Sequence, residues 1–185
     1  MKRLFICLLC VIGIAVTKAE LRTAIINGLW YMVDTENRVA VVIKQPQNLN
    51  IQITFKEPFK GKMIVPEKVE FYTNVLDDSP AIECTVVGIG PEAFMGWDKM
   101  TTVELPDQLQ FIDQKAFAEC NSLKRIDIPA SVDTIGAYAF ANCKKLRRVR
   151  FANSLGANAH NETWFVGTKA TVESVLMPGE SVSIY

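Results

Sequence analysis

Apolar residues recur with a period of 23 residues through the middle of the chain. Three consecutive blocks, 89–111, 112–134 and 135–157, align without a gap, and nine of their 23 columns are apolar in all three. Random placement in a chain that is 49% hydrophobic would give about three such columns. The pattern therefore predicts a solenoid, in which each coil covers the apolar faces of its neighbours.

Each block contains a short run in which apolar and polar residues alternate. These runs are Val103–Leu105, Ile126–Ile128 and Val149–Phe151, and Pro106 and Pro129 follow the first two. Alternation predicts strands with one buried face, and stacked coils would pair these strands in a parallel ladder with a spacing of about 4.8 Å. On the opposite side we expect a helical turn in each block, at Pro91–Phe94, Gln114–Phe117 and Ala137–Phe140.

The first part of the chain has a different pattern. Trp30–Val33 and Val39–Ile43 are rich in β-forming residues and flank the turn formers of Asp34–Asn37, which predicts a hairpin. Asn50–Phe55 alternates and is a third candidate strand. We interpret residues 20–61 as an N-terminal β cap that shields the open end of a solenoid spanning residues 62–185.

The repeat also carries a specific motif. The pattern I-G-x-x-A-F-x-x-C-x-x-L-x-x-I-x-I-P-x-S-V is nearly complete from Ile112 to Val132, and it resembles the BspA-type leucine-rich repeat of bacterial surface proteins. Residues 63–69 and 175–182 each repeat the strand-proline-valine half of this motif. The resemblance implies one α/β structural domain, a leucine-rich-repeat solenoid with short helical turns, and a role in adhesion or host-matrix binding.

The first 19 residues have the features of a secretory signal peptide. Two basic residues precede the uncharged segment Leu4–Val16, and Thr17-Lys18-Ala19 offers a small-residue cleavage site. A membrane anchor is the alternative, but the uncharged segment is shorter than the roughly 20 residues of a spanning helix. Lipid attachment at Cys10 is a second alternative, which Leu9 disfavours because a small residue is expected there. We expect an exported protein, at the cell surface, periplasmic or secreted, without a stable transmembrane span after cleavage.

Charge gives no sign of a nucleic-acid partner. The whole chain has 20 basic and 20 acidic residues, and loss of the leader would leave a mildly acidic protein. Cys84, Cys120 and Cys143 would remain, an odd number that rules out a complete disulfide framework. Because Cys120 and Cys143 occupy the same column of adjacent blocks, we expect a buried thiol column, with a single disulfide as the alternative.

The exposed face of the strand ladder is the predicted partner-binding surface, because repeat proteins usually bind through their aligned strands. Its positions are Thr102, Glu104, Arg125, Asp127, Arg148 and Arg150. The basic run Lys144–Arg150 is typical of a patch for nucleic acid or sulfated polysaccharide, or simply of a solvated surface. We favour the solvated surface, since Leu146 and Val149 within the run belong to apolar columns.

Sequence motifs for catalysis and metal binding are missing. There is no nucleophile elbow, glycine-rich phosphate loop, zinc-type cysteine pair or convincing acid dyad. The single histidine, His160, has no metal-ligand neighbours and is interpreted as a loop residue. Asn161-Glu162-Thr163 fits the N-glycosylation pattern, which a bacterial origin would leave unmodified. We expect no enzymatic activity, no metal and no cofactor.

These observations favour an exported, non-enzymatic protein that binds a protein ligand, such as a host matrix or surface protein. The alternative is a glycan-binding accessory protein in polysaccharide capture, which would need exposed aromatic residues on the ladder face. The repeats place their phenylalanines in apolar columns, and this counts against the alternative. Trp97, Trp164 and Tyr138 remain as candidates for an aromatic platform elsewhere.

Overall fold

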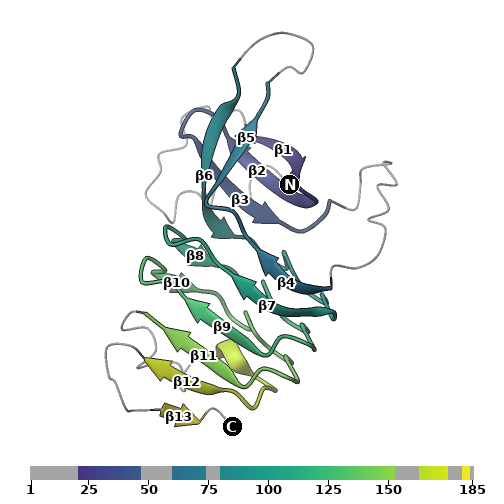
Figure 1. The fold of residues 1–185 in the computed structure, drawn as a ribbon, viewed down its shortest axis with the longest axis vertical. Helices are drawn as coiled ribbons and strands as arrows, with labels where there is room; N and C mark the ends of the chain where they lie inside the picture. The colour runs from purple at the N-terminus through teal and green to yellow at the C-terminus, as the bar shows by residue number, and fades with distance from the viewer. Residues whose placement is uncertain (1–20, 47–59, 74–79, 153–162, 175–180, 184–185) are drawn as a thin grey trace.

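The computed structural model describes residues 21–46, 60–73, 80–152, 163–174 and 181–183. Several features expected from the sequence lie outside these residues: the leader at 1–19, the candidate strand at 50–55, His160, most of the Asn161-Glu162-Thr163 motif and most of the half-repeat at 175–182. The described residues form two β-sheets, and nearly all of their regular secondary structure is β-strand (Figure 1).

The first sheet is the predicted ladder. Its strands, in spatial order, are β13 (Ser181–Ser183), β12 (Thr171–Ser174), β11 (Arg148–Phe151), β9 (Arg125–Ile128), β7 (Met100–Glu104) and β4 (Gly61–Ile64). All neighbours are parallel except β12 and β13. Paired residues from β7 through β12 lie 23 positions apart, as in Thr102 with Arg125 and Arg148 with Thr171. The predicted solenoid with a parallel strand ladder is therefore confirmed.

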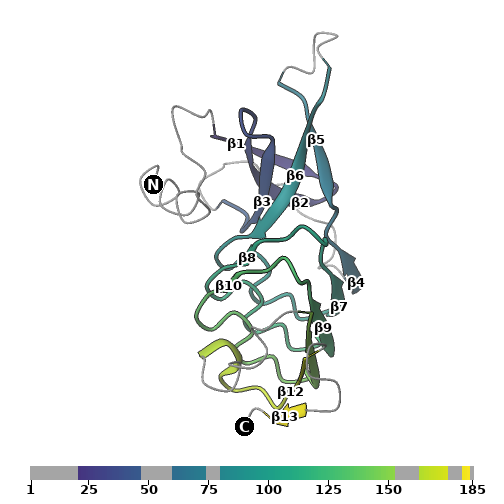
Figure 2. The ribbon, with the colours of Figure 1, turned by 90° about the vertical axis from the view of Figure 1, so that its left-hand side faces the viewer.

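The second sheet joins the N-terminal part of the chain to the solenoid. Its main path runs β1 (Leu21–Ile26), β2 (Leu29–Asp34), β3 (Val39–Ile43), β6 (Ile82–Ile89), β8 (Phe111–Ile112) and β10 (Thr134–Ile135), and β5 (Lys68–Phe71) pairs with β6. The predicted hairpin is present as β2 and β3, which pair antiparallel. β3 then pairs parallel with β6, β6 pairs parallel with the short strand β8, and β8 pairs parallel with the short strand β10 (Figure 2).

This second sheet contains elements that the sequence pattern did not predict. β1 adds an antiparallel strand to the hairpin, and β5 folds back antiparallel onto β6. β8 and β10 give each coil a second two-residue strand, so the coils are hydrogen-bonded on two sides. The N-terminal strands β1–β3 are thus continuous with one wall of the solenoid, because β3 extends the same sheet.

The expected helical turns are replaced by tight non-helical turns. In the first coil, the amides of Phe94 and Gly96 donate to the carbonyls of Ala116 and Ala118 in the next coil, at 2.8 and 2.9 Å. Alternate amides are thus committed to the neighbouring coil, and the continuous series of bonds that an α-helix requires cannot form. The intervening amides close turns on carbonyls three residues back, as Met95 does on Glu92. The described residues contain one helix, the 3-10 helix η2 (Thr163–Phe165).

The turns require left-handed backbone at two positions in each coil. One position is occupied by Glu92, Lys115 and Tyr138, and the other by Gly96, Glu119, Asn142 and Gly167, all with positive φ. Residues other than glycine rarely adopt this conformation, because the Cβ atom approaches the backbone. The inter-coil hydrogen bonds of neighbouring residues offset this cost.

A stack of phenylalanine rings runs along the solenoid axis. Phe94, Phe117, Phe140 and Phe165 are buried, and the centroids of successive rings lie 5.1, 5.5 and 5.2 Å apart with nearly parallel planes. Phe165 belongs to a fourth coil, whose Trp164 carbonyl accepts a hydrogen bond from the Phe140 amide. The sequence pattern did not reveal this coil, because Phe165 follows Phe140 by more than one 23-residue period.

Candidate binding surfaces

The ladder brings the six predicted binding-face residues together. Parallel pairing aligns Thr102 with Arg125 and then with Arg148, and it places Asp127 beside Arg150. Glu104 ends β7 two positions after Thr102, so its side chain lies on the same face. Thr102 is half-buried and the other five residues are exposed, while the intervening Val103, Ile126 and Val149 are buried in the core.

β4 adds two residues to this face that the sequence interpretation missed. Lys62 pairs with Thr102 and Ile64 with Glu104 in the sheet register. Lys62 forms an ion pair with Glu104, and Ile64 is 58% exposed. The half-repeat at 63–69 was the signal that could have placed them, but the insertion that follows it breaks the 23-residue spacing.

Positive charge gathers where β9 and β11 begin. Lys124 and Arg125 lie next to Arg147 and Arg148 of the following coil, and the Arg147 amide donates to the Lys124 carbonyl at 2.9 Å. These four side chains are exposed, and the preceding coil has two threonines, Thr101 and Thr102, at the same positions. We call Lys124, Arg125, Arg147 and Arg148 the basic cluster.

The first two residues of the basic run Lys144–Arg150 also face solvent. Lys144 and Lys145 are exposed in the turn, whereas Leu146 and Val149 are buried. The guanidinium of Arg147 donates to the carbonyls of Lys144 and Leu146, at 3.0 and 3.2 Å. The run is therefore divided between a turn and one exposed strand face, with its apolar residues in the core.

The cysteines of the described residues are free and buried. The thiols of Cys120 and Cys143 donate to the carbonyls of Phe94 and Phe117, each at 3.1 Å. The neighbouring Cys143 thiol and burial both raise the pKa of Cys120 above its ordinary value. Burial is also the main cause of the raised pKa of Cys84. A high pKa leaves little reactive thiolate, so this environment favours a packing role for the thiols.

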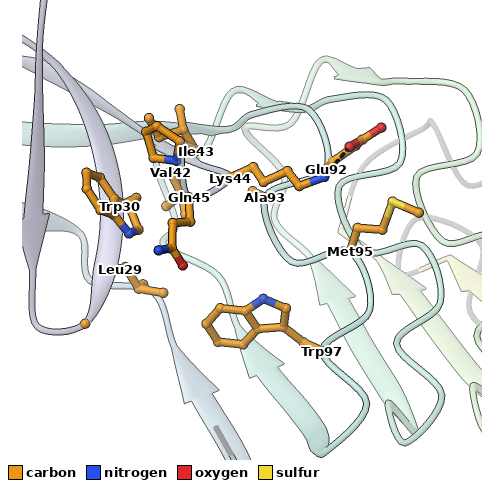
Figure 3. A pocket seen from close by; sticks show the side chains of 12 residues that line it. Leu29, Trp30, Val42, Ile43, Lys44, Gln45, Glu92, Ala93, Met95 and Trp97 are labelled. Atoms are coloured by element: carbon orange, nitrogen blue, oxygen red, sulfur yellow. Dashed lines mark hydrogen bonds and ion pairs between the residues drawn. The ribbon is translucent and has the colours of Figure 1, made fainter. Parts of the chain in front are cut away.

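A cleft of about 410 Å³ lies where the N-terminal sheet meets the first coil (Figure 3). One wall comes from β2 and the end of β3, with Leu29, Trp30, Val42 and Ile43, followed by Lys44, Gln45 and Pro46. The other wall comes from the first turn, with Glu92, Ala93, Met95 and Trp97. Lys44 and Glu92 form an ion pair of 2.8 Å between the two walls, and this contact lowers the pKa of Glu92.

Of the three candidates for an aromatic platform under the glycan-binding alternative, Trp164 is unsuitable because it is buried. Trp164 is buried against Phe151 and Phe165 and offers no exposed ring. Tyr138 is 40% exposed in the turn of the third coil. Trp97 lines the cleft together with Trp30, which the sequence interpretation assigned only to the hairpin.

The described residues include neither a candidate metal cluster nor a candidate membrane-spanning helix. In the part of the chain that the structure describes, no group of three His, Cys, Asp or Glu side chains is placed to hold a metal ion. Across those same residues, no helix has the length and apolar character that crossing a bilayer requires.

The chain is similar to known repeat proteins. A leucine-rich repeat protein of Bacteroides capillosus is 21% identical, with a TM-score of 0.56 over 82% of this chain and 97% of that one. A leucine-rich cell surface protein of Faecalibacterium prausnitzii A2-165 is 20% identical, with a TM-score of 0.48 over 83% of this chain and 39% of that one. No curated protein matches the chain. The family model described as "BspA type Leucine rich repeat region (6 copies)" matches residues 68–184, and the chain therefore belongs to the BspA-type leucine-rich repeat family.

Proposed function

We propose that this protein is a non-enzymatic binding protein that holds a protein partner against the exposed face of the β4–β7–β9–β11 ladder. The observation that carries the proposal is the basic cluster, Lys124, Arg125, Arg147 and Arg148, on two adjacent coils. Like charges on neighbouring strands destabilise a sheet, so their presence on an otherwise regular face favours a binding role.

The charges of the face indicate the chemistry of the partner. Arg125 and Arg148 are direct neighbours, whereas Arg150 lies beside Asp127 and Lys62 is paired with Glu104. Four basic side chains are thus concentrated at the beginning of the two strands, and an acidic segment of a partner protein would complement them. Exposed Ile64 at the β4 edge offers an apolar contact beside the charged rows.

A glycan ligand is less compatible with this face. The ladder positions Lys62, Ile64, Thr102, Glu104, Arg125, Asp127, Arg148 and Arg150 include no aromatic residue on which a sugar ring could pack. Adhesion at the bacterial cell surface is the setting that we propose, supported by the secretory leader expected at residues 1–19 and by membership of the BspA-type family.

A binding screen with a charge-reversed variant tests the proposal. The purified protein would be measured against immobilised fibronectin, fibrinogen and laminin and against a glycan array. We expect binding to at least one protein, weakened about tenfold or more in the double variant Arg125→Glu/Arg148→Glu and weakened by salt. A matched control, Lys68→Glu/Lys115→Glu, changes the net charge equally on the other sheet and its turns and should bind normally.

Two results would contradict the proposal. One is equal binding by the ladder variant and the control, which would remove the role of the basic cluster. The other is binding to glycans without binding to any protein, which would favour polysaccharide capture instead.

A further inference from the structure

We propose a second binding site, for a neutral carbohydrate, in the cleft between the N-terminal sheet and the first coil. This site lies on the other sheet from the ladder face and does not depend on the protein-binding role proposed above. Its volume of about 410 Å³ falls within the range of small-ligand pockets, roughly 300–1,000 Å³.

Two tryptophans from distant parts of the chain line the cleft. Trp30 comes from β2 and Trp97 from the end of the first turn, and both side chains face the same space (Figure 3). Trp97 is half-buried and its ring meets Phe94 edge to face, with centroids 5.0 Å apart, so that its position is fixed by the core. A sugar ring has an apolar C–H face, and a rigid indole is a suitable surface for it.

Trp30 also supplies a buried hydrogen-bond donor. The side chain is only 6% exposed, and within the described structure its Nε1 atom has no hydrogen-bond partner. In the view of Figure 3 this nitrogen is on the side of the ring toward the Gln45 carboxamide and the cleft. A buried donor without an acceptor destabilises the protein, and a ligand hydroxyl that accepts from it would recover part of this cost. A purely apolar ligand has no acceptor and would leave this donor without a partner.

The polar groups around the cleft favour a ligand without net charge. Lys44 and Glu92 neutralise each other in their 2.8 Å ion pair, and this leaves no single charge to attract an ionic ligand. Gln45 is exposed, and its amide offers both donors and an acceptor. Indole walls, a buried N–H and an amide together match a neutral sugar, which presents C–H faces and hydroxyls at the same time.

Calorimetric titration of the purified protein with neutral oligosaccharides tests this site. The probes would be xylohexaose, cellohexaose, maltohexaose, mannohexaose and N-acetylchitohexaose. We expect at least one to bind, and we expect Trp30→Phe to weaken that binding about tenfold, because the ring remains and only the donor is lost. The matched control is Trp164→Phe, which makes the same change in the fourth coil, away from the cleft, and should bind like the wild type.

Two further variants allow the site to be tested even if Trp30→Phe folds poorly. Gln45→Ala alters an exposed side chain at the cleft and should also weaken sugar binding. Arg125→Glu/Arg148→Glu should leave sugar binding unchanged, so failure at the ladder and failure at the cleft are distinguishable. The proposal is overturned if no oligosaccharide binds, if both cleft variants bind like the wild type, or if the cleft takes the peptide acetyl-Phe-amide in place of sugars.

Discussion

Arg125 of β9 and Arg148 of β11 are direct partners in the parallel register of the ladder, and both side chains are exposed. At the same position the flanking strands have Thr102 and Thr171. Along the ladder this position is therefore threonine in the two outer strands and arginine in the two central strands. Two like charges on adjacent strands repel each other, and the repulsion is strongest when little salt is present.

We predict that Arg125→Thr stabilises the fold slightly. Removing one of the two neighbouring charges should raise the free energy of unfolding by about 0.5 kcal/mol at low ionic strength, and less in 0.5 M salt. Urea denaturation at both salt concentrations would measure the change. Arg125→Lys, which keeps the charge, is the control, and a clear loss of stability in Arg125→Thr would show that the arginine has a structural role.

The phenylalanine stack predicts that removing its central ring strongly lowers the free energy of unfolding. Phe117 is fully buried between Phe94 and Phe140, with ring centroids 5.1 and 5.5 Å away. We expect Phe117→Ala to lower the free energy of unfolding by about 3–5 kcal/mol, because it removes both ring contacts and leaves a cavity. Phe117→Leu should cost clearly less. Thermal and urea unfolding would check both variants, and equal losses would argue against a special contribution of the stack.

The buried side chain of Tyr31 predicts a core substitution that does not lower the free energy of unfolding. Its ring is fully buried in the N-terminal sheet, and the hydroxyl has no partner among the described residues. Tyr31→Phe removes this unsatisfied group and retains the ring, so we expect it to be neutral or to stabilise the protein by about 1 kcal/mol. A loss of more than about 1 kcal/mol in chemical denaturation would instead indicate a hydrogen bond to the hydroxyl.

Alkaline pH should destabilise the protein by deprotonating buried tyrosine and cysteine side chains. Burial raises the pKa of Tyr31 above its ordinary 10.0, and the pKa values of Cys84 and Cys120 lie above their ordinary 9.0. The unfolded chain therefore loses these protons at a lower pH than the folded chain does. Their contribution to stability is complete below about pH 8 and is lost as the pH rises past 9 to 10.

Melting temperatures from pH 7 to 11 would measure this dependence. The loss above pH 10 should be smaller in Tyr31→Phe than in the wild type, since that variant lacks the phenol. An unchanged melting temperature up to pH 11 would contradict the expected contribution of the buried groups.

Sequence and structure agree where the repeat is regular. The positions of Val103, Ile126 and Val149 in one apolar column follow directly from the 23-residue period, and all three are buried in register. The charged residues between them were predictable as exposed, because side chains alternate across a strand. The face formed by β7, β9 and β11 was therefore predictable from the sequence, whereas the positions of Lys62 and Ile64 on β4 were not.

The turns were not predictable in the same way. Ala93 and Phe94 have spacing and composition that also suit a helical turn, but the Phe94 amide donates to the next coil. This hydrogen bond forms only when two coils are stacked, so local propensity does not reveal it. The fourth coil was not predicted for a related reason. Phe165 stacks on Phe140, but its distance along the chain does not match the 23-residue period.

By itself the sequence determined the repeat, its buried columns and the exposed ladder face, because these depend on alternation along the chain and on a constant spacing. Only the tertiary structure decided how the N-terminal hairpin joins the solenoid. The parallel pairing of β3 with β6 sets Val42 opposite Ile89, and this register brings Lys44 to Glu92 and places Trp30 and Trp97 around one cleft. No local pattern encodes that juxtaposition, because it arises from backbone hydrogen bonds between segments far apart in the chain.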